Sequence, residues 1–246
     1  MSAHLQAAVE RLYEVFARYP LNPGMPGSPL FEDWPEKNRR LSSKPLRELS
    51  ADDLREFAWE ALTTWGEEPD FKHFLPRLLE LLTQLPADVE PWIVLDKLRY
   101  EHGPWTTWPE TEQTAVRTFL LTFWEYLLTT TGAAIDEHFD DYFAALAYVY
   151  PDFGELLQRW ADSPAETATL RLVNLVYQHL PLLFGRRSKL PGFRDSPALG
   201  PPFVAWLTSV AVLTRLEAAF FATTEQDAAQ RISWLVQILE QRRELE

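Results

Sequence analysis

Residues 50–82 read SADDLREFAWEALTTWGEEPDFKHFLPRLLELL, and their apolar spacing sets the fold class. Ser50 with Asp53 forms a capping-box pattern, which predicts that a helix begins there. Apolar residues then recur at helical spacing as far as Gly66, where we expect this helix to end. Asp70 is the expected cap of a second helix, whose apolar stripe runs to Pro86. Pro76 lies inside that stripe and predicts a kink or a later start. The pair is predicted to form a helical hairpin.

The same reasoning predicts helices along most of the remaining chain. Thr107 to Glu110 and Ser163 to Glu166 have the capping-box spacing, so a helix is expected to begin at each. Further helices are expected over residues 136–150, 153–161 and 166–180. Residues 203–221 are apolar around most of the helix circumference and should be central, whereas residues 228–239 carry one narrow apolar stripe and should lie outside.

These patterns predict an all-α protein built from antiparallel helical hairpins in an irregular bundle or a HEAT-like array. No segment shows convincing strand alternation, and no repeat of fixed period is present. We expect a single domain over residues 1–246. The prolines and glycines of residues 20–30 predict a loop, and a basic loop is expected at about residues 185–200.

Composition describes an acidic globular protein and excludes several kinds of site. The 246 residues carry a formal net charge of −13, so nucleic acid is an improbable partner of the whole surface. The chain has no cysteine, which excludes disulfides and cysteine-ligated metals and fits a reducing, cytoplasmic location. Arg215 and Glu217 interrupt the most apolar run, so no membrane span is expected.

One block of the chain resembles a known family. It comprises PLRELSADDL (residues 45–54), ALTTWG (residues 61–66) and DFKHFLPRLLEL (residues 70–81). These motifs resemble those of an uncharacterised bacterial family of small α-helical proteins. Relatives can carry a cysteine pair just ahead of this block, and this chain has none there, so the resemblance implies no metal role here. It implies an all-α fold and carries no function with it.

The chain lacks the common catalytic signatures, including phosphate-binding glycine loops, the nucleophile elbow and the zinc-binding His-Glu-x-x-His helix. Its best polar constellation is Asp70, His73 and Arg77, whose spacing places a carboxylate, an imidazole and a guanidinium on one helical face beside Trp65. Such a trio could orient an acid–base histidine. The alternative is that Asp70 caps the helix, His73 packs at the hairpin and Arg77 pairs with a neighbouring carboxylate, and we favour it.

Residues 136–141 read DEHFDD and supply oxygen and nitrogen ligands at helical spacing. Acidic residues in a first helical turn are also what the helix dipole favours. A di-metal site in a helical bundle would need Glu-x-x-His motifs on facing helices, and the sequence has none. We therefore expect neither a metal nor a cofactor.

Positive charge collects in two segments that contain no acid. Residues 37–47 hold five basic residues and residues 185–194 hold four. The candidates for binding an anionic group of a partner are Arg39, Arg40, Arg186, Arg187, Lys189 and Arg194. Arginine suits carboxylate or phosphate because its planar fork binds both in a bidentate manner. The alternative, which we favour, is that the segments neutralise the protein's own acidic residues.

The chain has ten tryptophans, and aromatic side chains dominate the energetics of many interfaces. Most aromatic residues lie in apolar stripes and are expected in the core. Trp105 and Trp108 lie in a proline-broken segment and are the candidates for exposed, partner-binding aromatics, although burial is the commoner fate of such residues.

Taken together, the sequence favours a non-catalytic α-helical interaction module, expected by analogy to have an accessory or immunity-type role in a bacterial cell. Its partner would be another protein. The first alternative is an enzyme that uses the Asp70, His73 and Arg77 face. The second is recognition of an anion or nucleic acid through the two basic segments, provided that they converge in space.

Overall fold

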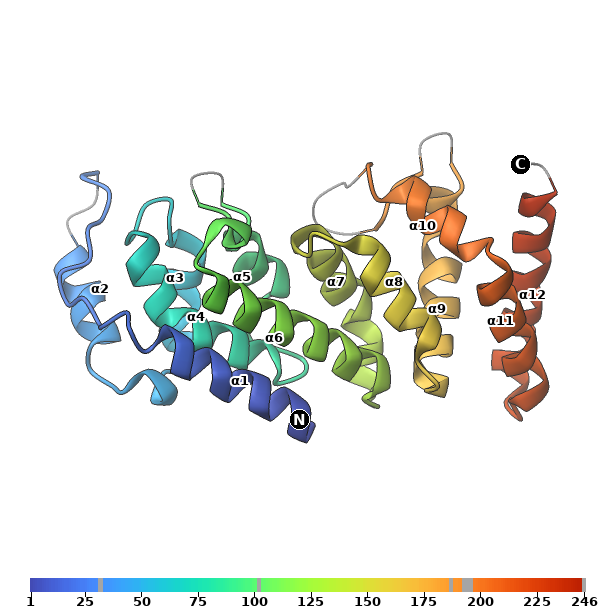
Figure 1. Cartoon of the computed structure of the whole chain (residues 1–246), viewed down its shortest axis with the longest axis horizontal. Helices are drawn as coiled ribbons and strands as arrows, with labels where there is room; N and C mark the ends of the chain where they lie inside the picture. The colour runs from blue at the N-terminus through green and yellow to red at the C-terminus, as the bar shows by residue number, and fades with distance from the viewer. Residues whose placement is uncertain (31–32, 101–102, 186–187, 192–196, 245–246) are drawn as a thin grey trace. The chain divides into compact units, whose positions relative to one another are not determined.

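The structure is a computed structural model, and it describes residues 1–30, 33–100, 103–185, 188–191 and 197–244. The described residues form twelve α-helices, two short 3₁₀ helices and no β-strand, which confirms the all-α prediction (Figure 1). The α-helices are α1 Ala3–Phe16, α2 Trp34–Leu41, α3 Ala51–Glu60, α4 Glu68–Leu82, α5 Pro91–Lys97, α6 Glu110–Thr129, α7 Ala133–Val149, α8 Phe153–Asp162, α9 Glu166–Leu183, α10 Gly200–Leu207, α11 Val210–Ala222 and α12 Gln226–Arg243. The 3₁₀ helices are η1 Leu46–Glu48 and η2 Trp105–Thr107.

The chain divides into two compact units, Met1–Phe123 and Trp124–Glu246. In the first unit, α4 packs against α1, α3 and α5. The predicted stripes form this unit's core, because Leu54, Phe57, Phe74 and Leu78 are all at most 1% exposed. The rings of Phe57 and Phe74 lie 4.6 Å apart between centroids. Burial of these stripes accounts for most of the favourable free energy of folding in this unit.

The boundaries of α3 and α4 differ from those expected. The capping box of Ser50 and Asp53 is present, but α3 ends at Glu60 and not at Gly66. The chain then turns tightly, with φ of +66° at Leu62 and +73° at Gly66. The helix α4 begins at Glu68, so Asp70 is not its N-cap. Asp70 instead occupies the third helical position and accepts a hydrogen bond from the backbone N–H of Glu67.

Pro76 does not interrupt α4, although its position in the apolar stripe predicted a kink or a later helix start. The helix α4 continues through Pro76 without interruption and ends at Leu82.

The loop of residues 20–30, which the sequence predicted, is held by hydrogen bonds to neighbouring segments. Gly66 N donates to Pro26 O at 2.7 Å, and the Asn38 side chain donates to Met25 O at 2.9 Å. Gly27 lies so close to the Trp34 ring that a Cβ atom would come within 2.1 Å of it.

The second unit is built around stacked aromatic rings. Trp124, Phe139, Phe143 and Trp160 come from α6, α7 and α8 and are all at most 1% exposed. Their ring centroids lie 5.0–6.3 Å apart. Phe203 of α10 extends the cluster, 5.6 Å from Phe143. Many of the aromatic residues that suggested a binding surface are therefore buried in the cores of the two units.

Residues 203–221 do not form one central helix, which corrects the prediction. The segment is divided between α10 and α11, because Thr208 leaves the helical conformation and Ser209 caps α11 by accepting from Val212 N. Only Val212, Leu213 and Leu216 of α11 are buried. The narrow stripe of α12 is as expected, with Ile232, Leu235 and Leu239 buried.

The predicted capping boxes at Thr107 and Ser163 do not cap helices. Thr107 lies in η2, and α6 begins at Glu110. The N-cap of α9 is Ala165, which has no side chain able to accept a hydrogen bond. The Ser163 hydroxyl is buried and has no hydrogen-bond partner within the described part of the chain.

Basic side chains from later helices satisfy the carbonyl groups at the ends of earlier helices. Lys97 donates to Trp59 O in the last turn of α3 at 2.8 Å. Arg171 donates to Leu127 O and Thr130 O at the end of α6. Arg215 donates to Trp160 O and Ala161 O at the end of α8. A cation is favourable at a helix C-terminus because the backbone carbonyls there are unsatisfied and carry partial negative charge.

The capping box of α3 predicts a specific acid sensitivity. Hydrogen bonds from Lys44 and from Ser50 lower the pKa of Asp53 from 3.8 to about 2. The folded state therefore holds the ionised carboxylate more strongly than the unfolded state does. The corresponding stability is present above pH 3.8 and is lost as the pH falls toward about 2. Asp53→Asn should flatten this part of the pH dependence in urea unfolding followed by circular dichroism. An acid limb identical to that of the wild type would contradict the assignment.

Candidate functional site

The structure does not bring Asp70, His73 and Arg77 to a common target. Asp70 is buried and accepts from Glu67 N and from the Asn22 side chain. His73 Nδ1 lies 2.8 Å from the Tyr19 carbonyl oxygen.

The third member of the trio is also engaged elsewhere. Arg77 donates to Leu49 O and to Glu80 Oε2. Asp70 and His73 thus fasten the segment of residues 19–22 to α4, and Arg77 fastens Leu49. Of the structural roles expected for the trio, the pairing of Arg77 with a neighbouring carboxylate is present, whereas Asp70 is not the N-cap of α4.

The first basic segment is not wholly a loop, because residues 37–41 belong to α2. Its cations are paired with acids of the same unit. Lys37 lies 2.7 Å from Glu56, and Arg40 shares that carboxylate. The remaining pairs are Lys44 with Asp53 and Arg47 with Glu10. Arg39 forms none of these ion pairs with the described residues. Ion pairs with acids of the same unit therefore neutralise most of the positive charge of this segment.

The second basic segment lies largely outside the described residues. Arg186, Arg187 and Arg194 are among the undescribed positions. Lys189 is described and is half-buried, with its backbone N–H donating to Leu182 O at 3.2 Å. The proposed anionic-partner role of this segment stays a prediction.

Trp105 and Trp108 are not exposed, and this corrects their assignment as surface anchors. They are 3% and 4% exposed, respectively. The Trp108 ring covers Lys72, whose Nζ lies 4.2 Å from the ring centroid. The proline-broken segment therefore closes over a charged side chain of α4, and sequence spacing alone could not show what lay beneath it.

Lys72 belongs to a buried charged cluster that the sequence did not indicate. Its ammonium group lies 2.7 Å from Glu68 and 3.0 Å from Glu112, whose side chain is fully buried. Glu112 also accepts a hydrogen bond from the Tyr19 hydroxyl at 2.7 Å. Burial alone would lower the pKa of Lys72, but the hydrogen bonds to both carboxylates hold it above the ordinary value. A lysine held protonated and enclosed in this way is a structural cation and not a nucleophile.

Residues 136–141 are also engaged in structural contacts. Asp136 accepts from Arg171 at 2.7 Å, and Asp140 lies 2.6 Å from His179 Nε2. His138 is exposed and lies 3.9 Å from Asp141. Within the described ranges, no three histidine, aspartate or glutamate side chains are grouped closely enough to hold a metal ion.

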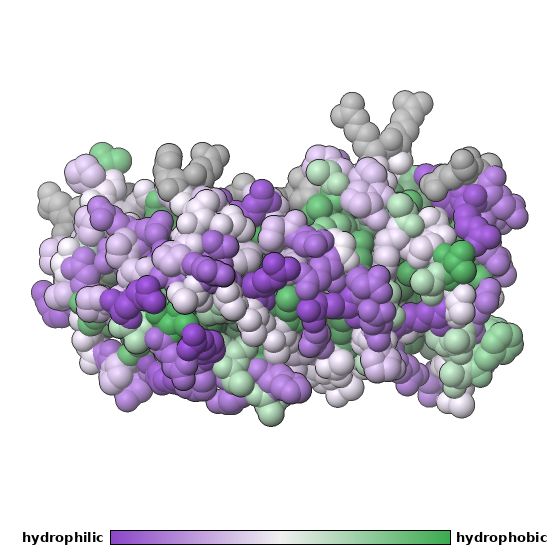
Figure 2. Space-filling model, viewed as in Figure 1, coloured by the Kyte–Doolittle hydropathy of each residue, from purple (hydrophilic) through white to green (hydrophobic). Residues whose placement is uncertain are grey.

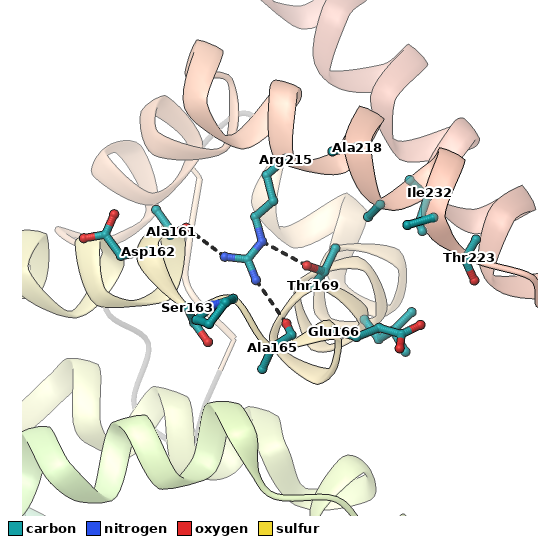
Figure 3. Close-up of a pocket in the computed structure, with 14 residues that line it drawn as sticks. Ala161, Asp162, Ser163, Ala165, Glu166, Thr169, Arg215, Ala218, Thr223 and Ile232 are labelled. Atoms are coloured by element: carbon teal, nitrogen blue, oxygen red, sulfur yellow. Dashed lines mark hydrogen bonds between the residues drawn. The ribbon is translucent and has the colours of Figure 1, made fainter.

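The second unit contains a pocket of about 470 Å³ between the α8–α9 turn and α11 (Figure 3). Arg215 reaches into it from α11. Its guanidinium donates to Thr169 Oγ1 at 2.9 Å and to the main-chain carbonyls that end α8. The apolar lining residues are Ala161, Pro164, Ala165, Leu170, Ala218, Ala219, Ala222 and Ile232. The pocket therefore combines a cation with a small-residue wall.

The outward face of α11 exposes large apolar side chains beside the polar Thr214 and Glu217. Val210 is 66% exposed, Phe220 38% and Phe221 84%. The two phenylalanine rings contact each other edge to face, 5.4 Å apart between centroids. On the part of the visible surface that α11 and α12 form, Figure 2 shows apolar residues in green beside hydrophilic residues in purple.

Comparison with models of protein families, with curated protein sequences and with solved structures finds no match to this chain. None of the described helices is by itself long and apolar enough to cross a membrane, although α10 and α11, bent by 54°, meet the length and composition test as a pair. The Arg215 pocket and the outward face of α11 are the two surfaces of the second unit that we consider further.

Proposed function

We propose that this chain is a non-catalytic helical interaction module that binds another protein through the outward face of α11. The observation that carries the proposal is the exposure of Phe221, a large aromatic side chain that is 84% accessible on a helix. Soluble monomers rarely expose contiguous apolar patches unless the patch binds something.

The remainder of α11 supports this assignment. The helix has the sequence VAVLTRLEAAFFA, in which Arg215 and Glu217 are the two charged residues. Arg215 turns inward to the end of α8. The exposed side therefore offers Val210, Phe221 and several alanines to a partner, together with the polar side chains of Thr214 and Glu217. Because the protein carries a net charge of −13, a partner with an apolar centre and a basic rim fits this surface best.

The test compares three forms of the full chain as baits for proteins from the native cell. Phe221→Ser removes the most exposed aromatic side chain, and Leu30→Ser is the matched control because Leu30 is also 84% exposed but lies in the first unit. A protein captured by the wild type and by the control should bind the Phe221→Ser variant about thirtyfold more weakly. The melting temperature should hardly change, since the side chain is on the surface.

Two results would overturn this proposal. The first is capture of the same proteins by all three baits. The second is sedimentation of the wild type, but not of Phe221→Ser, with vesicles of phosphatidylethanolamine and phosphatidylglycerol, because the exposed face would then bind lipid.

A further inference from the structure

Arg215 is a half-buried cation that has no carboxylate partner among the residues that the structure describes. Its Nη1 donates to two carbonyl oxygens and its Nε to Thr169, whereas Nη2 has one long contact, 3.3 Å from Ala165 O. Arg171 performs a similar capping role at the end of α6, yet it also pairs with Asp136. Burial lowers the pKa of Arg215, and no neighbouring acid offsets this effect. A guanidinium has five N–H donors, so one donor on Nη2 is left for a ligand.

A second source of positive potential lies at the same pocket. The helix α9 begins at Glu166, and its N-cap residue, Ala165, has no side-chain acceptor, although its carbonyl oxygen accepts from Ala168 N at 3.2 Å. Among the described residues, the backbone N–H groups of Glu166 and Thr167 have no acceptor, and the helix dipole adds partial positive charge at this end. Ala165 and Glu166 both line the pocket. An anion placed there would meet the guanidinium and the end of α9 together.

The remaining walls define what the anion must be attached to. Ala218, Ala222 and Ile232 form a side without polar atoms beyond the backbone, and Figure 3 shows Ala218 and Ile232 on the helices beyond the guanidinium. Pockets that bind small ligands have volumes of about 300 to 1,000 Å³, and this one falls in that range at about 470 Å³. An apolar chain of modest length fits this wall.

The exposed carboxylates at the rim limit the charge of the ligand. Asp162 and Glu166 line the pocket, and both are exposed. In Figure 3 the Asp162 carboxylate is directed away from the guanidinium. These two acids repel a doubly charged group such as phosphate more strongly than a singly charged carboxylate. The lining therefore favours a monoanion.

We propose that the Arg215 pocket binds a single carboxylate group carried at the end of a short apolar chain. The carboxylate accepts hydrogen bonds from Nη2 of Arg215 and from the first turn of α9, and the chain lies against Ala218, Ala222 and Ile232. The exposed residues Ala218 and Ala222 of α11 line this pocket, whereas Val210 and Phe221 do not. The Phe221→Ser and Arg215→Lys variants therefore test the two proposals separately.

Calorimetric titration of the full chain with octanoate tests the pocket, with octanamide and inorganic phosphate as comparison ligands. Octanoate should bind, and both others should bind at least tenfold more weakly, because octanamide lacks the charge and phosphate meets the rim acids. Arg215→Lys should weaken octanoate binding about tenfold to a hundredfold, since an ammonium group lacks the planar fork.

A second variant retains Arg215, which caps the end of α8, so that a loss of binding cannot be ascribed to unfolding. Ala218→Leu fills the pocket from α11, while Ala211→Leu places the same side chain on an exposed position of α11 that does not line it. Leucine and alanine have similar helix propensities. Binding should disappear in the first variant and persist in the second. Equal binding by the two variants, or equal binding of octanoate and octanamide to the wild type, would overturn the proposal.

A further pair of ligands distinguishes two sources of the carboxylate, a polypeptide C-terminus and a free alkyl carboxylate. These are the peptide N-acetyl-Leu-Leu-Ala with a free C-terminal carboxylate and the same peptide as its C-terminal amide. Tighter binding of the free-carboxylate peptide than of octanoate would identify a polypeptide terminus as the ligand. Tighter binding of octanoate would identify a free alkyl carboxylate. If neither octanoate nor the free-carboxylate peptide binds, the pocket is not a carboxylate site.

Discussion

Replacing Trp160 by alanine is expected to lower the free energy of unfolding by about 3 to 5 kcal/mol. The Trp160 side chain is fully buried at the centre of the second unit. Its ring centroid lies 5.3 Å from that of Trp124 and 5.0 Å from that of Phe143. Its indole N–H also donates to Ala168 O at 2.8 Å, which joins α8 to α9. The substitution removes these contacts and leaves a cavity that a rigid aromatic cluster cannot close.

Trp206 provides the matched comparison in the same unit. Its ring lies 5.5 Å from that of Trp160, but the side chain is only half-buried, although residues 203–221 were expected to be central. Trp206→Ala should therefore cost distinctly less than Trp160→Ala. Urea unfolding followed by circular dichroism at 222 nm, the usual wavelength for helix content, measures both. Equal losses for the two variants would show that the aromatic core extends further than the structure indicates.

The core of the first unit could be predicted from the sequence because its signal is local. Leu54, Phe57 and Phe74 recur at helical spacing, and all three are buried. The helix boundaries were less predictable, because more than one acidic residue near the start of α4 can act as its N-cap. Glu67 and Asp70 form the capping box of α4, so the helix begins before the aspartate that the sequence indicated as its cap.

Burial around α11 could not be predicted because composition does not show which faces find a neighbour. The run of residues 203–221 is apolar, yet a break at Thr208 and Ser209 turns the chain and leaves Phe221 on the surface. Trp105 shows the opposite error, because a segment broken by prolines is nevertheless buried. In both cases tertiary packing overrides the local pattern.

The candidate sites were missed for a related reason. The partners of Arg215 lie 46 to 55 residues earlier in the chain, so no motif brings them together. Lys72 and Glu112 are likewise joined by the fold and not by spacing. The one signal that the sequence offered was an arginine inside an apolar run, which we used to argue against a membrane span. The same residue also indicated a buried cation that needed a partner.

Glu112→Ala is expected to destabilise the protein by about 3 to 5 kcal/mol, because it leaves the ammonium group of Lys72 buried without its fully buried partner. Glu68 would remain 2.7 Å from that group, but its side chain is 44% exposed and compensates only in part. The control is Glu14→Ala, which breaks the exposed pair with Arg11 and should cost less than about 1 kcal/mol.

The double variant Lys72→Met with Glu112→Leu distinguishes two contributions to the free energy of unfolding. One is the cost of a buried charge without its partner, and the other is the net stabilisation by the ion pair. Removing both charges should restore most of the lost stability, because apolar residues of similar volume avoid the desolvation cost that the ion pair carries. The coupling energy from a double-mutant cycle, measured by urea unfolding, should then be large and of opposite sign to the single losses. If the double variant is as unstable as the sum of its single variants, Lys72 and Glu112 act independently, and the pair interpretation is wrong.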